Sequence, residues 1–570
     1  MNEQRNLWVA IASAVVILIG WQFFFAPEPD TQVREAQVRE QLDASGSNPP
    51  QASTGGPSVP GGQPAVPTVN RDDALAKSPR IAIDTPRVEG SIRLVGGVID
   101  DIQLQDYHET EEPDSPLIHV LNPTGSSDAY FAEFGWVGTG KDVVLPSSET
   151  RWSASDDTLT VDNPITLSWD NGAGLTFKRE ISIDQNYLFT VNQSVVNNSG
   201  SEVTLHPYGL ISRKNKPQTA GFYILHEGPL GVIDGTLTEI DYDDLADDGA
   251  VEKKTTGGWL GITDKYWLVA LAPSSDEEMT TRFSHHFAEN TDKYQTDYLG
   301  AARTVANGSE AKAETRLFAG AKEVTLLDTY AEDYGITNFD LAIDFGWFYF
   351  LTKPFFLVLQ WMYHLVGNFG VAILLITVAV KAVMFPLANK SYKSMSAMKK
   401  LQPQITEMRE QFKDDRQRQQ QEMMALYKRE KINPASGCLP IIVQIPVFFA
   451  LYKVLFVSIE MRHAPFFGWI QDLSAPDPTS LFNLFGLIPF DPPQMLMIGV
   501  WPLIMGLTMF LQQKLNPAPA DPTQAKIMMF LPLIFTFMLA SFPAGLVIYW
   551  AWNNTLSIIQ QRYIMYKMGI

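Results

Sequence analysis

Six charge-poor apolar runs, one near the start of the chain and five in its last third, constrain the fold most strongly. The first run, LWVAIASAVVILIGWQFFF (7–25), contains no charged residue. As an α-helix rising ~1.5 Å per residue, it nearly crosses a ~30 Å hydrocarbon core. The other five runs lie at about 369–387, 438–457, 495–511, 527–542 and 544–559. Together they predict a polytopic α-helical membrane protein with six spans.

The first run ends without the small residues that precede a signal-peptidase cut. It closes with Phe23, Phe24 and Phe25, and no small-x-small pattern is present there. A secretory signal also has a shorter apolar region. We therefore predict an uncleaved signal anchor over residues 1–25, with a cleaved signal peptide as the alternative.

An acidic, water-soluble block separates the apolar ends. Residues 26–345 contain 23 Lys and Arg against 51 Asp and Glu, whereas the rest of the chain contains 20 against 12. Such asymmetry usually separates partners or compartments, and the acidic block gives no sign of nucleic-acid binding. Its first part, 26–80, is rich in Pro, Gly, Ser and Gln and predicts a disordered tether.

From about residue 81 the pattern changes to that of β-strands. In YLFTVNQSVV, Phe189, Val191 and Val195 share one face and alternate with polar residues, as in a half-buried strand. NNSG (197–200) then gives a turn, and similar runs recur to about 325 at the spacing of a sandwich. We predict an all-β domain over residues 81–340.

This β domain carries six histidines and many carboxylates, but no catalytic or metal-binding motif. HExxH, CxxC and GxSxG patterns are absent, as is a phosphate-binding glycine loop. The single cysteine, Cys438, excludes an intramolecular disulfide. We predict that the chain is not an enzyme and uses no cofactor or metal. A sugar-binding or sugar-modifying site is the alternative.

The distribution of basic residues predicts on which side of the membrane each loop lies. Loop 388–437 holds 11 Lys and Arg against 6 Asp and Glu, whereas loop 458–494 holds one Arg against four carboxylates. Because basic loops stay on the cytoplasmic side, we predict that loop 388–437 and both termini are cytoplasmic. The acidic block then lies outside.

Two segments beside the second apolar run are amphipathic. In GWFYFLTKPFFLVLQWMYHLVG (346–367), polar residues form one narrow stripe, which suits a helix lying in the membrane surface. Within 388–435, apolar residues at three–four spacing are followed by KDDRQ and a second helical stretch. This pattern predicts an antiparallel helical hairpin with a basic surface.

Lys381 lies within the apolar run ITVAVKAVMFPL, so a cation is predicted inside a span. One explanation is snorkelling, because Lys381 is six residues from Leu387 and its ammonium could reach the interface. The other is a wet groove open to the cytoplasm. Tyr549, Asn553 and Ser557 share one face of the last run, and polar groups in lipid normally face a partner or a water-filled cavity. This polar face favours the groove.

The groove hypothesis leads to expectations for two further positions. Gln444, between two prolines in the run 438–457, adds a second polar group to it. The helix periodicity of the last run turns position 548 away from the groove, toward lipid.

Four stretches carry a resemblance to a known family: VGNFGVAILLITVAVKAVMFPL, LQPQITEMREQFKDDRQRQQQEMMALYKREKINPASGCLPIIVQIPVFFALYKVL, RHAPFFGWIQDLSAPDP and FPAGLVIYWAWNNTLSIIQQ. Through them, residues 346–565 resemble the YidC/Oxa/Albino family of membrane protein insertases. The anchor and acidic domain match the layout of its Gram-negative form. The resemblance implies a periplasmic β-supersandwich at 81–340, an interfacial helix at 346–367 and a five-span insertase core at 369–565.

The resemblance also implies which residues form the hydrophilic groove and contact client proteins. The residues matched to the family are Lys381, Thr377, Tyr549 and Trp550, and those added from their polarity are Gln444, Asn553 and Ser557. At the position of Lys381 the family usually has arginine. Lysine keeps the charge but loses the bidentate guanidinium fork.

In the family, the cytoplasmic hairpin recruits clients. The hairpin residues assigned to this surface are Met395, Met398, Lys399, Lys400, Met408 and Arg409. Some relatives also carry a long basic tail for ribosomes. The tail here, RYIMYKMGI, is short and does not favour docking of that kind.

The implied function is that of a membrane protein insertase and chaperone of the inner membrane, acting alone or with the Sec translocon. The implied partners are nascent membrane proteins, the lipid bilayer, the Sec translocon, the ribosome and the signal-recognition-particle receptor, with no nucleic acid bound directly. A client's polar segment would enter the groove, and its apolar helix would move into lipid by hydrophobic burial. The alternative is a membrane-tethered periplasmic carbohydrate-binding or epimerase-like protein.

Overall fold

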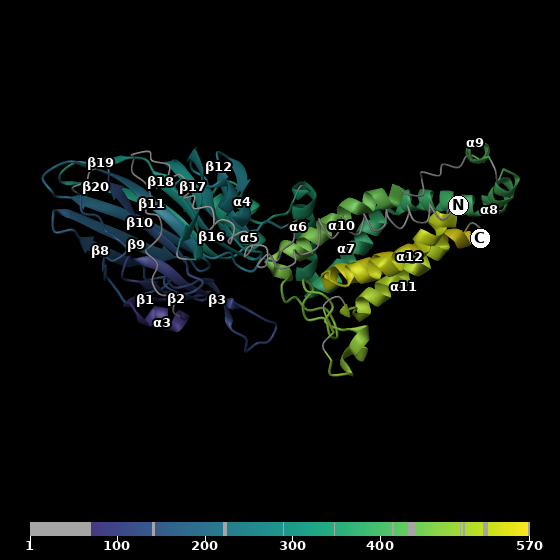
Figure 1. The fold of residues 1–570 in the computed structure, drawn as a ribbon, viewed down its shortest axis with the longest axis horizontal. Helices are drawn as coiled ribbons and strands as arrows, with labels where there is room; N and C mark the ends of the chain where they lie inside the picture. Colours follow the sequence, from purple (N-terminus) through teal and green to yellow (C-terminus); the bar gives the residue numbers. More distant parts are fainter. Residues whose placement is uncertain are drawn as a thin grey trace, which may run out of the picture. The chain divides into compact units, whose positions relative to one another are not determined.

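The computed structural model describes residues 70–567, apart from 139–142, 220–224, 289, 347, 413–414, 431–438, 491, 494–495 and 517–521. The described chain divides between Asp344 and Phe345 into two compact units, a β unit and a helical unit (Figure 1). The predicted signal anchor and most of the predicted tether lie outside the described residues.

The β unit begins before the predicted boundary at residue 81. Arg71–Ala76 form helix α3, whose N-cap is Asn70. Ala74 is buried, and Arg71 forms an ion pair with Asp101. The last residues of the segment predicted as a tether are therefore packed against the β unit, because a capped turn and an ion pair hold them there.

Two sheets make up the β unit. The larger has the order β14 (Val251–Thr256), β17 (Glu278–Ala288), β18 (Thr291–Gly300), β11 (Val203–Lys214), β5 (Tyr130–Gly138), β3 (Val98–His108), β2 (Val88–Arg93), β1 (Arg80–Asp84), β7 (Thr158–Leu159), with β19 (Arg303–Val305) on β11 and β4 (Leu117–Leu121) on β3. The smaller has the order β13 (Thr236–Glu239), β12 (Gly228–Ile233), β15 (Trp259–Thr263), β16 (Trp267–Pro273), β20 (Ser309–Ala321), β10 (Leu188–Asn197), β9 (Leu175–Ile183), β8 (Ile165–Asp170), β6 (Ser153–Ala154). The later helical segments of this unit are α4 (Tyr242–Asp248), α5 (Val324–Tyr334) and the 3-10 turn η1 (Phe339–Ala342).

The strand predicted from YLFTVNQSVV is β10, which pairs antiparallel with β9 on one side and β20 on the other. Phe189, Val191 and Val195 are fully buried, whereas Thr190, Asn192, Ser194 and Val196 remain partly exposed. The predicted period-two alternation is therefore confirmed.

Hydrogen bonds join the two sheets through their shared core. Arg179 of β9 is 2% exposed and donates to the backbone carbonyl oxygens of Gly97 and Phe134 on the side of the larger sheet. Tyr130 of β5 donates from its hydroxyl to the carbonyl oxygen of Ile262 in β15, at 3.2 Å. These bonds cross between sheets that enclose a common apolar core, so the predicted β-sandwich is confirmed.

The helical unit follows from residue 345. Its helices are α6 (Tyr349–Val366), α7 (Phe369–Val383), α8 (Phe385–Gln411), α9 (Arg416–Arg429), α10 (Leu439–Val457), α11 (Val500–Leu515), α12 (Pro522–Leu539) and α13 (Ala544–Lys567), with 3-10 turns η3 (Ile459–Met461) and η4 (Leu481–Gly486). Helix α13 packs against α7, α8, α10 and α11, so it is the centre of the unit.

The segment predicted as a hairpin (388–435) contains most of α8 and all of α9. The two helices pack through a cluster of Leu401, Ile405 and Leu426. The apolar residues that the sequence spaced three and four apart thus form a core between two helices. The cytoplasmic position of this pair stays a prediction.

Among the described helices, no single one is both long and apolar enough to pass a test for a membrane crossing. Helices α6 and α7 pass it as a pair, bent by 120° at their junction.

We predict that Gly320 of β20 cannot accept a side chain. A Cβ there would lie 2.3 Å from Cγ of Tyr187, which is fully buried. Gly320→Ala should lower the stability of the β unit by ~1–3 kcal/mol, because the aromatic ring must move. Thermal unfolding of the purified protein measures the loss. Gly138→Ala is the matched control, since the nearest atoms to its Cβ would be methyl groups of Leu145 and Leu205, at an ordinary contact distance of 3.5 Å. Equal losses in both variants would contradict this explanation.

Candidate functional site

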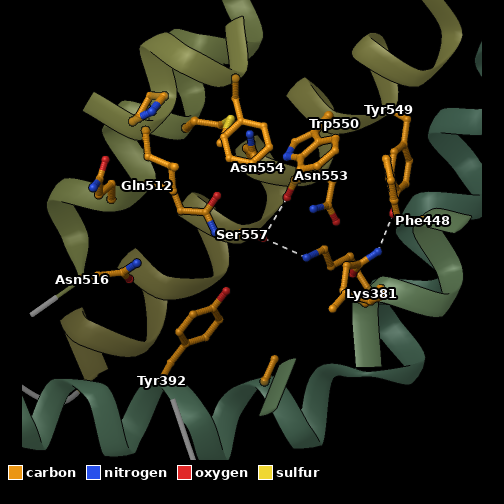
Figure 2. Close-up of a pocket in the computed structure, with 18 of the residues that line it drawn as sticks. Lys381, Tyr392, Phe448, Gln512, Asn516, Tyr549, Trp550, Asn553, Asn554 and Ser557 are labelled. Atoms are coloured by element: carbon orange, nitrogen blue, oxygen red, sulfur yellow. Dashed lines mark hydrogen bonds between the residues drawn. The ribbon is translucent and has the colours of Figure 1, made fainter. Parts of the chain in front are cut away.

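Helices α7, α8, α10, α11, α12 and α13 together enclose a cavity of about 450 Å³ (Figure 2). Its polar lining residues are Lys381, Tyr392, Gln444, Gln512, Gln513, Asn516, Tyr549, Asn553, Asn554 and Ser557. Methionine, aromatic and aliphatic side chains line the remainder. The cavity therefore offers one cation, several amides and hydroxyls, and an apolar wall.

Lys381 lies in the last turn of α7 and turns its ammonium toward α13. Its Nζ donates a hydrogen bond to Oγ of Ser557 at 2.8 Å, and that hydroxyl donates to the backbone carbonyl oxygen of Asn553 at 2.8 Å (Figure 2). No Asp or Glu is among the described residues that line the cavity. The charge of Lys381 is thus compensated by a hydroxyl dipole rather than by a carboxylate. The ammonium group therefore favours binding of an anionic or polar group in the cavity.

Part of the wall beside Lys381 is built from α10 and α13 (Figure 2). Gln444 donates from its amide to the hydroxyl of Tyr549 (Figure 2). Beside this pair, the rings of Phe448 and Trp550 meet edge to face, with centroids 4.7 Å apart. Phe535 of α12 adds a ring 6.1 Å from Trp550. Polar and aromatic groups therefore lie next to each other on one wall.

Two amide oxygens of the cavity lining have no hydrogen-bond partner among the described residues. Oδ1 of Asn553 and Oε1 of Gln513 are both buried and unpaired. An unsatisfied buried acceptor is unfavourable unless water or a ligand donates to it. The cavity can therefore hold water or the donor groups of a polypeptide.

The structure brings six of the seven predicted groove residues to this cavity, and Thr377 is the exception. The Thr377 side chain is buried, and its hydroxyl donates to the carbonyl oxygen of Ile373 one turn earlier, at 2.6 Å. Its polarity is satisfied within its own helix, as is common for threonine in helices.

The expectation that position 548 faces lipid is wrong. Ile548 is 1% exposed, because α13 is surrounded by α7, α8, α10 and α11 and has little free surface at that level. Ile559, further along α13, is 59% exposed and faces outward.

The residues predicted to recruit clients fall into two groups. Met395 lines the cavity and packs against Ala388, Tyr392 and Ile564, and Met408 packs into the core between α8 and α9. The other four are partly or fully exposed: Met398, Lys399, Lys400 and Arg409. The three basic residues thus reach the surface, whereas two of the methionines are engaged in packing.

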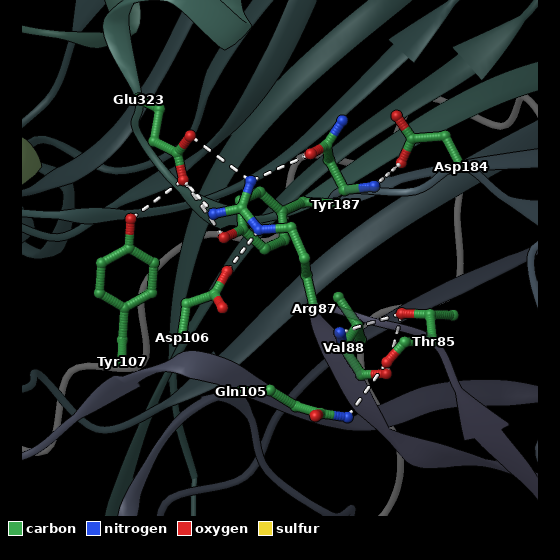
Figure 3. A network of polar contacts seen from close by, with 10 residues as sticks. Thr85, Arg87, Val88, Gln105, Asp106, Tyr107, Asp184, Tyr187 and Glu323 are labelled. Carbon is green, nitrogen blue, oxygen red and sulfur yellow. Dashed lines mark hydrogen bonds and ion pairs between the residues drawn. The ribbon is translucent and has the colours of Figure 1, made fainter. Parts of the chain in front are cut away.

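The β unit contains polar networks, but its histidines do not converge. Arg87 forms ion pairs of 2.5 Å with Asp106 and Glu323, and Tyr107 donates to Glu323 at 3.0 Å (Figure 3). This network ties β2 and β3 to the N-terminus of α5. No group of three potential metal ligands occurs among the described residues.

Two basic side chains, Lys322 and Arg179, are buried in the β unit. Burial lowers the pKa of Lys322 to about 8, and its Nζ donates to Oγ1 of Thr263 at 2.8 Å. Burial also lowers the pKa of Arg179 to about 10. Both side chains join strands through hydrogen bonds, which is a structural role.

Sequence reasoning missed several cavity residues. Gln512 and Gln513 follow the apolar run 495–511, but α11 continues to Leu515 and carries them to the cavity, together with its C-cap Asn516. Asn554 directly follows the predicted Asn553 and donates to Oγ1 of Thr508 at 3.3 Å. A count of amide residues just beyond the apolar runs could have identified this group.

Comparison with protein families assigns both units. The YidC periplasmic domain model matches residues 80–358, and the 60Kd inner membrane protein model matches residues 361–569. The membrane protein insertase YidC of Methylorubrum extorquens (strain PA1) is 52% identical over 592 residues, covering 100% of this chain and 96% of the relative. That of Brucella suis biovar 1 is 52% identical over 591 residues, covering 100% and 97%.

Solved structures give weaker likenesses. A crystal structure of an active YidC insertase with its first transmembrane domain resolved is 20% identical and covers 85% of this chain and 92% of its own, with a TM-score of 0.37. A galactose mutarotase related enzyme from Lactobacillus acidophilus is 12% identical and covers 42% and 97%, with a TM-score of 0.29. The family assignment rests on the whole-chain identities: this chain belongs to the YidC family of membrane protein insertases.

Proposed function

We propose that the cavity between α7 and α13 receives the polar segment of a nascent membrane protein while its apolar helix passes into lipid. The observation that carries this proposal is Lys381, a cation in an apolar helix, bonded to Ser557 and facing a cavity whose described lining holds no carboxylate. A carboxylate of the client ~4 Å from Nζ would gain ~4 kcal/mol at an effective dielectric constant of ~20.

Neutral groups would hold the rest of the segment. Amides such as Asn553 and Gln513 have unsatisfied oxygens that can accept hydrogen bonds from the backbone of a client. The rings of Phe448, Trp550 and Phe535 provide an apolar surface along which the client's helix leaves for the bilayer. The step needs no covalent chemistry, because hydrophobic burial of the client helix drives it.

The proposed topology uses the anchor at 7–25 and helices α7, α10, α11, α12 and α13 as spans, with α6 in the membrane surface. Both termini and the α8–α9 pair then lie in the cytoplasm and the β unit in the periplasm. The excess of Lys and Arg in 388–437 supports this orientation. The cavity would open toward the cytoplasm, because α8 contributes to its lining.

Partners beyond the client follow from this arrangement. The basic side chains of α8 suit the acidic surfaces of the ribosome or of the signal-recognition-particle receptor. The Sec translocon is proposed as a partner for clients with large translocated domains. The carbohydrate-binding alternative is set aside, since relatives that match the whole chain are insertases.

We predict that the charge at position 381 matters more than its shape. Lys381→Arg should keep insertion of a client with an acidic translocated segment, whereas Lys381→Met should reduce it by on the order of tenfold, equal to about 1.4 kcal/mol. Insertion can be measured by protease protection of the client in vesicles that contain equal amounts of each variant. Lys381→Met provides nearly the same volume without charge, so equal activity of the two variants would refute the electrostatic role.

We also predict that water reaches Asn553 but not the outward face of α13. In a Cys438→Ser background, Asn553→Cys should react with a membrane-impermeant maleimide added from the cytoplasmic side. Ile559→Cys should stay unlabelled, because a thiol in hydrocarbon rarely ionises. Mass spectrometry quantifies both. Labelling at 559 with none at 553 would mean that the cavity is closed to water.

A third prediction concerns the basic residues of α8. Replacing Lys399, Lys400 and Arg409 together by glutamate should lower insertion several-fold, because the positive surface that attracts the ribosome or receptor is lost. The same three positions exchanged as Lys→Arg and Arg→Lys form the matched control and should retain activity. Labelling of Asn553→Cys should be unchanged in both, and wild-type insertion by the glutamate variant would exclude a recruiting role.

A further inference from the structure

The connection between α10 and α11 ends in an apolar tip, residues 481–490. Its sequence, LFNLFGLIPF, contains no charged residue. Large apolar side chains of the tip are solvent-exposed, with Leu487 83% and Phe490 51% exposed. The others are Leu481, Phe482, Leu484, Phe485 and Ile488. An exposed apolar cluster of this density is a hallmark of an interaction surface.

The base of the tip is fixed to the ends of two helices. Asp477 accepts hydrogen bonds from the backbone N–H of Trp501, at 2.9 Å, and from the hydroxyl of Thr479, at 2.6 Å. The backbone N–H of Ala544, the first residue of α13, donates to the carbonyl oxygen of Ala475 at 2.7 Å. The tip therefore emerges at the level where α11 and α13 begin. Figure 1 shows the connection projecting from the helices there.

The tip keeps an unusual backbone conformation. Leu484 and Phe485 have φ of 48° and 59°, the left-handed region that bulky residues rarely adopt. Hydrogen bonds inside the tip hold them: Phe485 N–H donates to the carbonyl oxygen of Ser480 at 2.8 Å, and Ile488 N–H to that of Asn483 at 3.1 Å. A strained turn that is retained in this way is often tied to function.

The polar side chains of the tip are also bonded internally. Nδ2 of Asn483 donates to the carbonyl oxygen of Phe490 at 3.4 Å, and Oγ of Ser480 donates to that of Leu496 at 2.9 Å. Backbone and side-chain donors that are satisfied within a loop can leave water without a large desolvation penalty. The described tip thus presents mainly apolar side chains to its surroundings.

We propose that residues 481–490 insert into the interfacial region of the bilayer leaflet at the N-terminal ends of α11 and α13, as a lipid anchor. This inference rests on the proposed spans α11 and α13. Lipid is favoured as the occupant because the tip begins where those helices would leave the hydrocarbon core. The ten residues of the tip also include no charged side chain, which favours lipid as the occupant. Trp469 lies in the same connection, and its Nε1 donates to Asp477 at 3.1 Å. Tryptophan is typical of this depth.

Lipid proximity can be measured directly. In the Cys438→Ser background, Leu487→Cys is labelled with an environment-sensitive fluorophore and the full chain is reconstituted into phospholipid nanodiscs. Lipids that carry a nitroxide near the headgroup should quench the fluorophore at least twofold. The same fluorophore on Asn307→Cys, an exposed position in the β unit, is the aqueous reference and should be unaffected.

A second variant tests the chemistry of the anchor. The double variant Phe482→Asp, Phe490→Asp should abolish the quenching at position 487, because two carboxylates resist transfer from water. Maleimide labelling of Asn553→Cys in the same variant reports whether the helices are intact and tests the proposed cavity separately. No quenching at 487 while 553 still labels would overturn the lipid anchor and leave the proposed function standing. If the fluorophore at position 487 became shielded from water only when a client was present, the tip would be a binding site for the client instead.

Discussion

The requirement that each polar group in an apolar helix find a partner organises the helical unit. Helix α13 carries several of these groups, and neighbouring helices bond three of them: Lys381 of α7 bonds Ser557, Gln444 of α10 bonds Tyr549, and Thr508 of α11 bonds Asn554. Each bond fixes the rotation of α13 against one neighbour.

This constraint explains why part of the site could be predicted from the sequence. The i, i+4, i+8 spacing of Tyr549, Asn553 and Ser557 places them on one face of any helix, and the structure does bring all three to one cavity. Lys381 stands out because apolar packing cannot explain a charged side chain within an apolar run. The same reasoning failed for Ile548 because periodicity gives the angle between residues, not the number of neighbours around a helix. Thr377 was predicted in the groove but does not line it, because its hydroxyl forms its hydrogen bond within its own helical turn.

For the β unit, the strands and their packing as a sandwich were predictable, but the order of the strands within each sheet was not. Alternation in β10 follows from local sequence, because side chains of a strand point to opposite faces. The order of strands depends on pairings between distant segments, such as β10 with β20, and no local signal specifies them. Arg179 is a further example. A buried arginine is unexpected from composition, yet carbonyl oxygens of Gly97 and Phe134 accept its hydrogen bonds across the core.

The depth of Lys381 links the cavity to the membrane. Asn368, the N-cap of α7, donates from its side chain to the carbonyl oxygens of Pro465 and Phe466, both at 3.2 Å, so α7 begins level with the connection that carries the apolar tip. Lys381 follows twelve residues after Phe369, which is ~18 Å along a helix axis. In a ~30 Å hydrocarbon core, ~12 Å then remains on the far side of the cation. In the proposed topology, a polar client segment that entered through those ~12 Å would meet amides and Lys381 before it met hydrocarbon, so the apolar barrier left to cross would be ~18 Å rather than ~30 Å. The cation therefore need not carry the client across. In the proposed mechanism, its position inside the span shortens the step that costs most free energy, the transfer of polar groups through hydrocarbon.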